Sequence, residues 1–84
     1  MTPTAGEIED WIVARVAGLT GLPVGDVDPE APVARHGLDS VALIALTTDL
    51  EKRFGYRFRE NPLDRYPTIT ALSEFLAGQP GEAG

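Results

Sequence analysis

The residues best suited to chemistry lie in one short run, Gly37-Leu38-Asp39-Ser40-Val41. A helix-forming stretch follows directly, so the Ser40 hydroxyl is expected at a helix N-terminus. Unpaired backbone N–H groups and the positive end of the helix dipole favour a negative group there. A phosphate attached to Ser40 would therefore be electrostatically favoured. A purely structural interpretation is that Asp39 or Ser40 only caps the helix, because both residue types are preferred caps.

The composition of the chain argues against several other kinds of site. Its 84 residues fit a single domain, 1–84, with a core over about 5–78, and a domain of this size leaves little room for a deep catalytic pocket. There are no cysteines, so no thiolate nucleophile can form, and the single histidine, His36, cannot make a histidine cluster. We therefore expect no catalytic residues, no metal site and no enzymatic activity.

The charge and hydropathy of the chain narrow the range of its partners. Seven basic and 13 acidic residues give a net charge of −6, which disfavours nucleic acid because binding a phosphate backbone relies on a basic surface. The acidic balance suits recognition by basic patches on partner proteins, or solubility alone. No apolar run approaches the roughly 20 residues of a membrane span, and the N-terminus lacks a signal-peptide pattern. We expect a cytoplasmic monomer that binds neither membrane nor nucleic acid.

Hydrophobic periodicity and capping residues predict an all-α fold, a small four-helix bundle with three main helices and a short third one. A capping box at Thr4 and Glu7 marks the start of the first helix, and Thr68 caps the last. A flexible tail or linker is expected after the last helix. The four helices and the tail are expected over residues 6–19, 40–54, 62–66, 69–77 and 79–84.

A long loop is expected over residues 20–38, between the first and second helices. Its prolines and glycines break any sustained period, and a loop of this length in a small domain needs a role. Its apolar residues are spaced to reach the core repeatedly, so we interpret the loop as packing across the helices and presenting Ser40. Arg35 and His36 are expected on its surface. The apolar residues are Leu22, Val24, Val27 and Val33.

The second helix, expected over 40–54, has two apolar faces. At about 100° per residue, one stripe gathers toward the core. A shorter strip of Val41, Ile44 and Thr48 lies beside Ser40 and is expected to be exposed, although a helix buried on two sides would also fit. An exposed apolar strip rimmed by charge often marks a protein contact. The core stripe consists of Leu43, Leu46, Thr47, Leu50 and Phe54.

The charged residues around the end of this helix are interpreted as surface. Asp49 and Arg53 are four residues apart and are expected to form a solvated ion pair. Three arginines follow the helix, and they either tune the choice of partner or are neutral surface residues. Phe58, between two of them, is expected to fill a gap in the core. The arginines are Arg57, Arg59 and Arg65.

Together these motifs resemble those of acyl carrier proteins. The resemblance covers residues 8–76 and rests on GLDS ending at Ser40, on a helix closing in DLEKRFG (49–55), and on YPTI (66–69) followed by an ALSEFL helix. GLDS alone recurs by chance, whereas all of these motifs in this order are specific. GLDS with the YPT run is most similar to carriers of polyketide synthases, with fatty-acid and peptidyl carriers as alternatives in the same family.

The resemblance implies a function for Ser40 and its neighbours. Ser40 would carry 4′-phosphopantetheine, transferred from coenzyme A by a phosphopantetheinyl transferase with Mg²⁺ and release of 3′,5′-ADP, and Asp39 would help the transferase to dock. The terminal thiol would hold acyl groups as thioesters for ketosynthase, acyltransferase or acyl-ligase partners. The carrier itself would catalyse nothing. The docking face implied for the partners consists of Leu38, Val41, Ile44, Thr48 and Glu51.

A function of a different class is a helical interaction module that carries no attached group. Such a module would use Val41 and Ile44 for docking and Ser40 only as a helix cap. The two hypotheses differ in whether Ser40 gains a phosphopantetheine.

Overall fold

The computed structural model describes residues 3–78, which form the predicted all-α bundle. No β-strand occurs within this range, and one isolated bridge joins Pro32 and Thr68. None of the described helices is long and apolar enough to cross a membrane. The elements are α1 (Ala5–Thr20), α2 (Ser40–Phe54) and α3 (Ile69–Ala77), with 3-10 turns η1 (Val24–Asp26), η2 (Val33–His36) and η3 (Pro62–Asp64).

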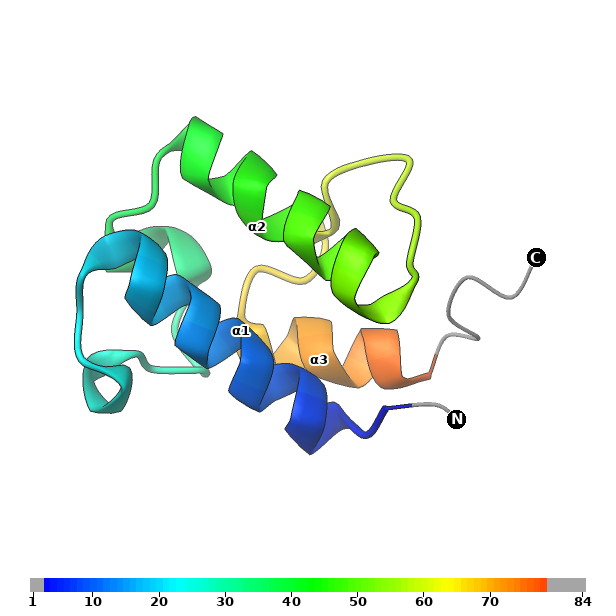
Figure 1. Ribbon diagram of the computed structural model, residues 1–84, viewed down its shortest axis with the longest axis horizontal. Helices are drawn as coiled ribbons and strands as arrows, with labels where there is room; N and C mark the ends of the chain where they lie inside the picture. Colours follow the sequence, from blue (N-terminus) through cyan, green and yellow to red (C-terminus); the bar gives the residue numbers. More distant parts are fainter. Residues whose placement is uncertain (1–2, 79–84) are drawn as a thin grey trace.

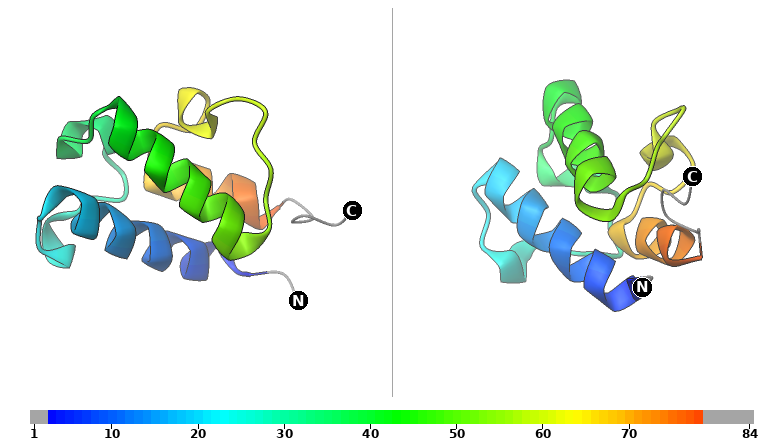
Figure 2. Two further views of the ribbon diagram at one scale, coloured as in Figure 1. Left: turned by 45° about the horizontal axis from the view of Figure 1, so that its top comes forward. Right: turned by 45° about the vertical axis from the view of Figure 1, so that its right-hand side comes forward.

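The three helices are arranged so that α1 packs against both α3 and α2. The start of α2 lies at the end of the bundle where α1 finishes, whereas α1 begins and α3 ends at the opposite end (Figure 1). The segment that contains η3 lies on the side of α2 away from α1, next to α3 (Figure 2). The first residues of α2 are therefore remote from both ends of the described chain.

Capping residues set the helix boundaries. Thr4 Oγ1 accepts the Glu7 N–H and Glu7 Oε1 accepts the Thr4 N–H, both at 3.1 Å, which confirms the predicted capping box. Thr68 Oγ1 accepts the Ala71 N–H at 3.0 Å at the start of α3. The helices α2 and α3 have the predicted bounds, and α1 is one residue longer than predicted at each end.

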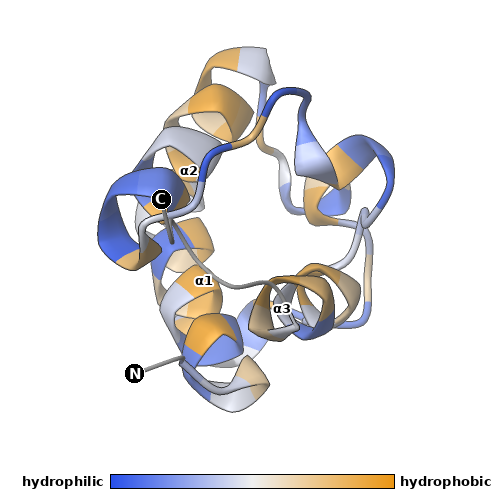
Figure 3. Ribbon diagram, turned by 90° about the vertical axis from the view of Figure 1, so that its right-hand side faces the viewer, coloured by the Kyte–Doolittle hydropathy of each residue, from blue (hydrophilic) through white to orange (hydrophobic). Residues whose placement is uncertain are grey.

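The core receives side chains from all three helices and from the long loop. Seen from the end of the bundle, the helices and the segment between α2 and α3 surround a common centre (Figure 3), which these side chains fill. Trp11 packs edge-on against Phe54 with 5.6 Å between ring centroids, so it joins α1 to the end of α2. The most deeply buried apolar residues are Ile8, Ile12, Val16, Val33, Leu46, Leu50, Ile69, Leu72 and Leu76.

The long loop packs across the helices as predicted, with two local differences. Val27 is buried, but Val24 is 57% exposed because it opens the η1 turn, which leaves its side chain on the surface. His36 is half-buried rather than on the surface, because its Nε2 accepts the Asp28 N–H at 3.0 Å and ties two parts of the loop together. Arg35 is exposed, as predicted.

The segment before α3 contains the 3-10 turn η3 and not the short helix predicted over 62–66. Asn61 caps the turn by accepting the Leu63 N–H at 2.9 Å, but the turn ends before Arg65. One turn fits the short space between the cap and Pro67, and short connectors of this kind are commonly 3-10. Leu63 is buried, so the turn still anchors the segment to the core.

Candidate functional site

A buried leucine and a left-handed glycine position the Ser40 hydroxyl. Gly37 ends η2 with a φ of 85°, a conformation that favours glycine. Leu38 then enters the core and is only 8% exposed. Asp39 and Ser40 follow on the surface. Because Leu38 anchors the backbone beside them, the exposed serine has a fixed position at the start of α2.

The N-cap of α2 is Asp39 and not Ser40. The Asp39 carboxylate accepts the Ala42 N–H at 2.8 Å, and Ser40 is the first residue of the helix. Within residues 3–78, nothing is hydrogen-bonded to the Ser40 hydroxyl. The capping interpretation therefore applies to Asp39 alone, and it leaves the serine oxygen exposed and available for reaction.

The start of α2 is electrostatically suited to a phosphate ester on Ser40. Helix geometry leaves the N–H groups of Ser40 and Val41 without acceptors inside the helix, and the dipole places partial positive charge at the same end. The Ala42 N–H is already used by Asp39. A phosphodiester on the Ser40 oxygen would thus lie beside free donors, which is the arrangement that anion sites at helix N-termini use.

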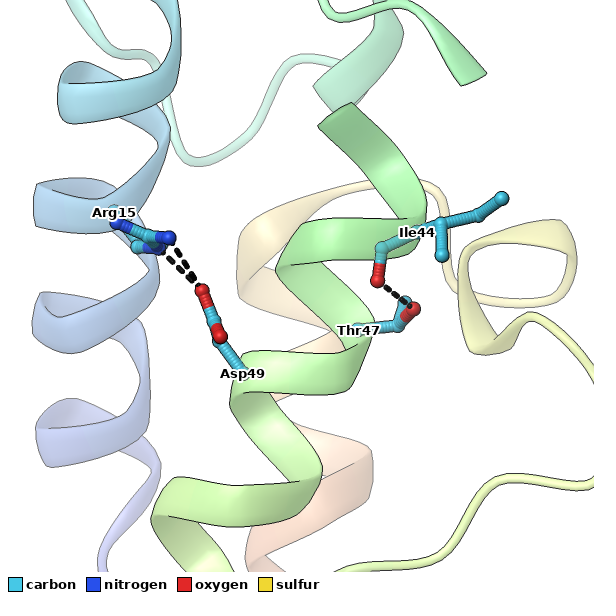
Figure 4. Close-up of polar contacts among 4 residues, drawn as sticks. All are labelled: Arg15, Ile44, Thr47 and Asp49. Carbon is cyan, nitrogen blue, oxygen red and sulfur yellow. Dashed lines mark hydrogen bonds and ion pairs between the residues drawn. The ribbon is translucent and has the colours of Figure 1, made fainter. Parts of the chain in front are cut away.

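The predicted apolar strip beside Ser40 is exposed. Val41 is 74% and Ile44 62% exposed, which excludes a helix buried on two sides at this level. In Figure 4 the Ile44 side chain points away from α1. Thr48 is half-buried and contributes less surface than predicted. Two large apolar side chains one and four residues after Ser40 form a surface typical of protein contacts.

The remaining two residues of the implied docking face have structural roles. Leu38 belongs to the core, as described above. Glu51 is half-buried, and its Oε2 accepts the Phe58 N–H at 2.8 Å, which fastens the segment after α2 to the helix. The exposed part of the face is therefore smaller than the resemblance implies.

Asp49 pairs with Arg15 of α1 and not with Arg53. The Arg15 Nε lies 2.7 Å from Asp49 Oδ2 (Figure 4), so the expected pair within α2 is wrong. Asp49 lies on the side of α2 that faces α1, where Arg15 reaches it. The Arg53 guanidinium is instead 5.2 Å from the centroid of the Phe54 ring. The ion pair thus links two helices on the side of α2 away from Ile44.

A groove of about 250 Å³ runs beside Ile44, between α2 and the segment around η3. Thr47, predicted to face the core, borders this groove, and its hydroxyl donates to the Ile44 carbonyl at 3.0 Å. Its place in this surface was not predicted from the sequence. The available signal was its spacing, because residues three apart on a helix share a face.

A sequence model of the phosphopantetheine attachment site matches residues 10–76. The chain belongs to this family of carrier domains. Among curated relatives, the carrier is 28% identical to acyl carrier protein TtuC of Teredinibacter turnerae over 93% of this chain and 90% of that protein. It is 34% identical to 5-methyl-1-naphthoate synthase of Streptomyces sahachiroi, over 98% of this chain and 5% of the synthase. The carrier therefore matches almost all of TtuC but only a twentieth of the synthase.

Solved structures show the same carrier fold. A free-standing peptidyl carrier protein from Acinetobacter baumannii superposes with a TM-score of 0.80 and 29% identity, covering 87% of this chain and 91% of that one. The HMG-ACPI domain of the CurA module from Lyngbya majuscula gives a TM-score of 0.79 over 92% and 83% of the two chains, and at 23% identity it bears on the fold alone. The domain is an acyl carrier that binds 4′-phosphopantetheine covalently.

Proposed function

We propose that Ser40 is the attachment point of 4′-phosphopantetheine and that the chain carries intermediates of polyketide biosynthesis between partner enzymes. The observation that carries the proposal is the division of roles at the start of α2, where Asp39 caps the helix and the Ser40 hydroxyl is exposed and unbonded within residues 3–78. Polyketide biosynthesis is supported by relatives such as polyketide synthase PksL of Bacillus subtilis, 36% identical over 68 residues.

The chain supplies the oxygen and its position. When attached, 4′-phosphopantetheine provides a thiol that holds acyl groups as thioesters, and the chain has no cysteine of its own to do so. The Ser40 oxygen forms a bond to the phosphorus next to pantetheine in coenzyme A, the pyrophosphate bond breaks, and 3′,5′-ADP leaves. The serine proton passes to a base of the phosphopantetheinyl transferase, because Asp39 is already engaged in capping.

The chain performs no catalysis under this proposal and acts as a substrate of its partners. In support, Asp39 is the only ionisable residue between Gly37 and Ile44, and it is engaged in capping. The partners are the transferase and enzymes of the ketosynthase, acyltransferase or acyl-ligase type, which would meet Val41 and Ile44. A monomeric state and a cytoplasmic location remain predictions.

The proposal is tested by intact mass spectrometry. The chain is incubated with coenzyme A, Mg²⁺ and a broad-specificity phosphopantetheinyl transferase, and the expected result is a gain of one phosphopantetheine. Ser40→Ala should show no gain, whereas Thr48→Ala, a matched loss of a hydroxyl on the same helix, should be modified normally. An unmodified wild-type chain that is folded by circular dichroism would contradict the proposal and favour a non-carrying interaction module.

A further inference from the structure

The end of α2 and the segment that follows it concentrate the positive charge of this acidic chain. Five of the seven basic residues but only two of the 13 acidic residues lie between positions 52 and 65, so this stretch has a net charge of +3 in a chain of −6. Figure 3 shows hydrophilic and hydrophobic residues alternating along it. This stretch of the chain is therefore opposite in net charge to the remainder.

A cavity of about 260 Å³ opens in the same segment. Its wall includes three half-buried aromatic side chains, Phe58, Tyr66 and Phe75, and Arg59 and Arg65 border it. The rings of Tyr66 and Phe75 stack at 4.3 Å between centroids with 15° between their planes. Pockets for drug-sized ligands are about 300 Å³ or larger. The cavity is therefore suited to a single large apolar side chain.

The wall of this cavity is held in place by the protein itself. The Phe58 N–H donates to Glu51 Oε2 at 2.8 Å, and the Tyr66 N–H donates to the Pro62 carbonyl at 2.9 Å. The Phe58 ring also stacks on the buried Tyr56, with 6.1 Å between centroids. A cavity whose wall is already ordered costs less conformational entropy when a ligand binds.

We propose that this basic aromatic pocket binds an acidic segment of a partner protein. An aromatic side chain of that segment fills the cavity, and carboxylates on either side of it pair with Arg59 and Arg65. Arginine forms bidentate, charge-assisted hydrogen bonds with carboxylates. Aromatic residues and arginine also dominate the energetics of protein interfaces. The cavity lining holds three arginines and one glutamate, Arg57, Arg59, Arg65 and Glu60, so its net charge is +2. This charge favours an acidic partner, in contrast to the acidic remainder of the chain, which suits basic ones.

The test is an NMR titration of the full chain with a synthetic probe peptide, acetyl-Asp-Glu-Phe-Glu-Asp-amide. The amide signals of Phe58, Arg59 and Tyr66 should shift, and the dissociation constant should rise with added salt. A matched peptide with Asn and Gln in place of the acids should bind about tenfold more weakly. The titration needs no modification of Ser40, so its failure leaves the carrier proposal untouched.

Three variants distinguish peptide binding in the pocket from general electrostatic attraction to the chain. Arg59→Gln and Arg65→Gln should each weaken peptide binding about tenfold. Lys52→Gln removes the same charge from an exposed residue outside the pocket, and should change the dissociation constant by no more than about twofold. The backbone NMR spectrum of each variant checks that it is folded.

Four outcomes would overturn the inference. Shifts that avoid the pocket, or equal losses in all three variants, would show only diffuse attraction. Phenylacetate binding as tightly as the peptide would assign the pocket to a small carboxylate. An oligothymidylate binding more tightly than the peptide would assign it to single-stranded nucleic acid.

Discussion

The two halves of α2 have opposite surroundings. In the first half Ser40, Val41 and Ile44 form an exposed face, while the opposite face packs on the core through Leu43 and Leu46. In the second half Leu50 is fully buried, and Phe54 packs against Trp11 of α1. One 15-residue helix thus presents the proposed attachment residue at its exposed start, and its second half packs against α1. Substitutions of the exposed side chains in the first half should therefore affect partner binding, and substitutions of buried side chains in the second half should affect stability.

The largest effect is expected from removing a core side chain of the second half. Leu50→Ala leaves a cavity where the side chain is fully buried, and should lower the free energy of unfolding by about 3 kcal/mol. Ile44→Ala, a comparable truncation in the exposed half, should change it by less than about 0.5 kcal/mol. Urea denaturation followed by circular dichroism measures both values. Similar losses in the two variants would remove the distinction between the halves.

A charge in the exposed strip should impair the reaction with a partner enzyme and leave the fold intact. Ile44→Asp places a carboxylate in the surface beside Ser40 and should lower kcat/KM for the phosphopantetheinyl transferase about tenfold, with an unchanged helical spectrum. Val24→Asp is the matched control, because Val24 is also an exposed apolar residue but lies on the long loop. Loss of the fold in Ile44→Asp would show that this residue is part of the core after all.

The buried Tyr56, just after α2, should make the free energy of unfolding fall at alkaline pH. The buried Tyr56 hydroxyl donates to the Leu76 carbonyl at 2.7 Å, and burial raises the pKa of Tyr56 above its ordinary value of 10.0. The folded state thus favours the neutral phenol, so this contribution is complete below about pH 10 and is lost as pH rises through the raised pKa.

Replacing this tyrosine tests the anchor directly. Tyr56→Phe should lower the free energy of unfolding by about 1 kcal/mol at neutral pH and flatten its decline at alkaline pH. Tyr66→Phe is the control, because no hydrogen bond from the Tyr66 hydroxyl is found in the described part of the chain. Urea midpoints across the alkaline range give both curves. An equally steep alkaline decline in Tyr56→Phe would contradict this assignment.

The smallest effect is expected at the ion pair between α1 and α2. Both side chains of Arg15–Asp49 are partly exposed, so a double-mutant cycle with alanine should give a coupling of about 0.5 kcal/mol. The coupling should fall toward zero in 1 M salt, where the Debye length is roughly 3 Å. A coupling that survives high salt would mean that the pair is shielded from solvent. The pair would then stabilise the contact between α1 and the second half of α2 more than its exposure suggests.

Local signals allowed most of the fold to be predicted from the sequence. Helix starts depend on side chains within three residues, as at Thr4 and Thr68, so their positions follow from spacing alone. The exposed strip was equally predictable, because helical periodicity places Val41 and Ile44 away from the Leu46 and Leu50 face.

The incorrect predictions concern features that helical spacing does not encode, namely a contact between distant residues and the turns of the long loop. Arg15 reaches Asp49 from another helix, 34 positions away, and no spacing rule within α2 reveals such a partner. The exposure of Val24 follows from the η1 turn in a loop without periodicity. The burial of Leu38 depends on the left-handed turn at Gly37, which directs the next side chain inward before α2 begins.

The attachment of phosphopantetheine to Ser40 is tested most directly by peptide-resolved mass spectrometry of the loaded chain. Trypsin cleavage after Arg35 and Lys52 gives a peptide whose only hydroxyl side chains are Ser40, Thr47 and Thr48. Fragment ions should place the whole added mass on Ser40. Added mass on either threonine, or on any other peptide, would contradict the account.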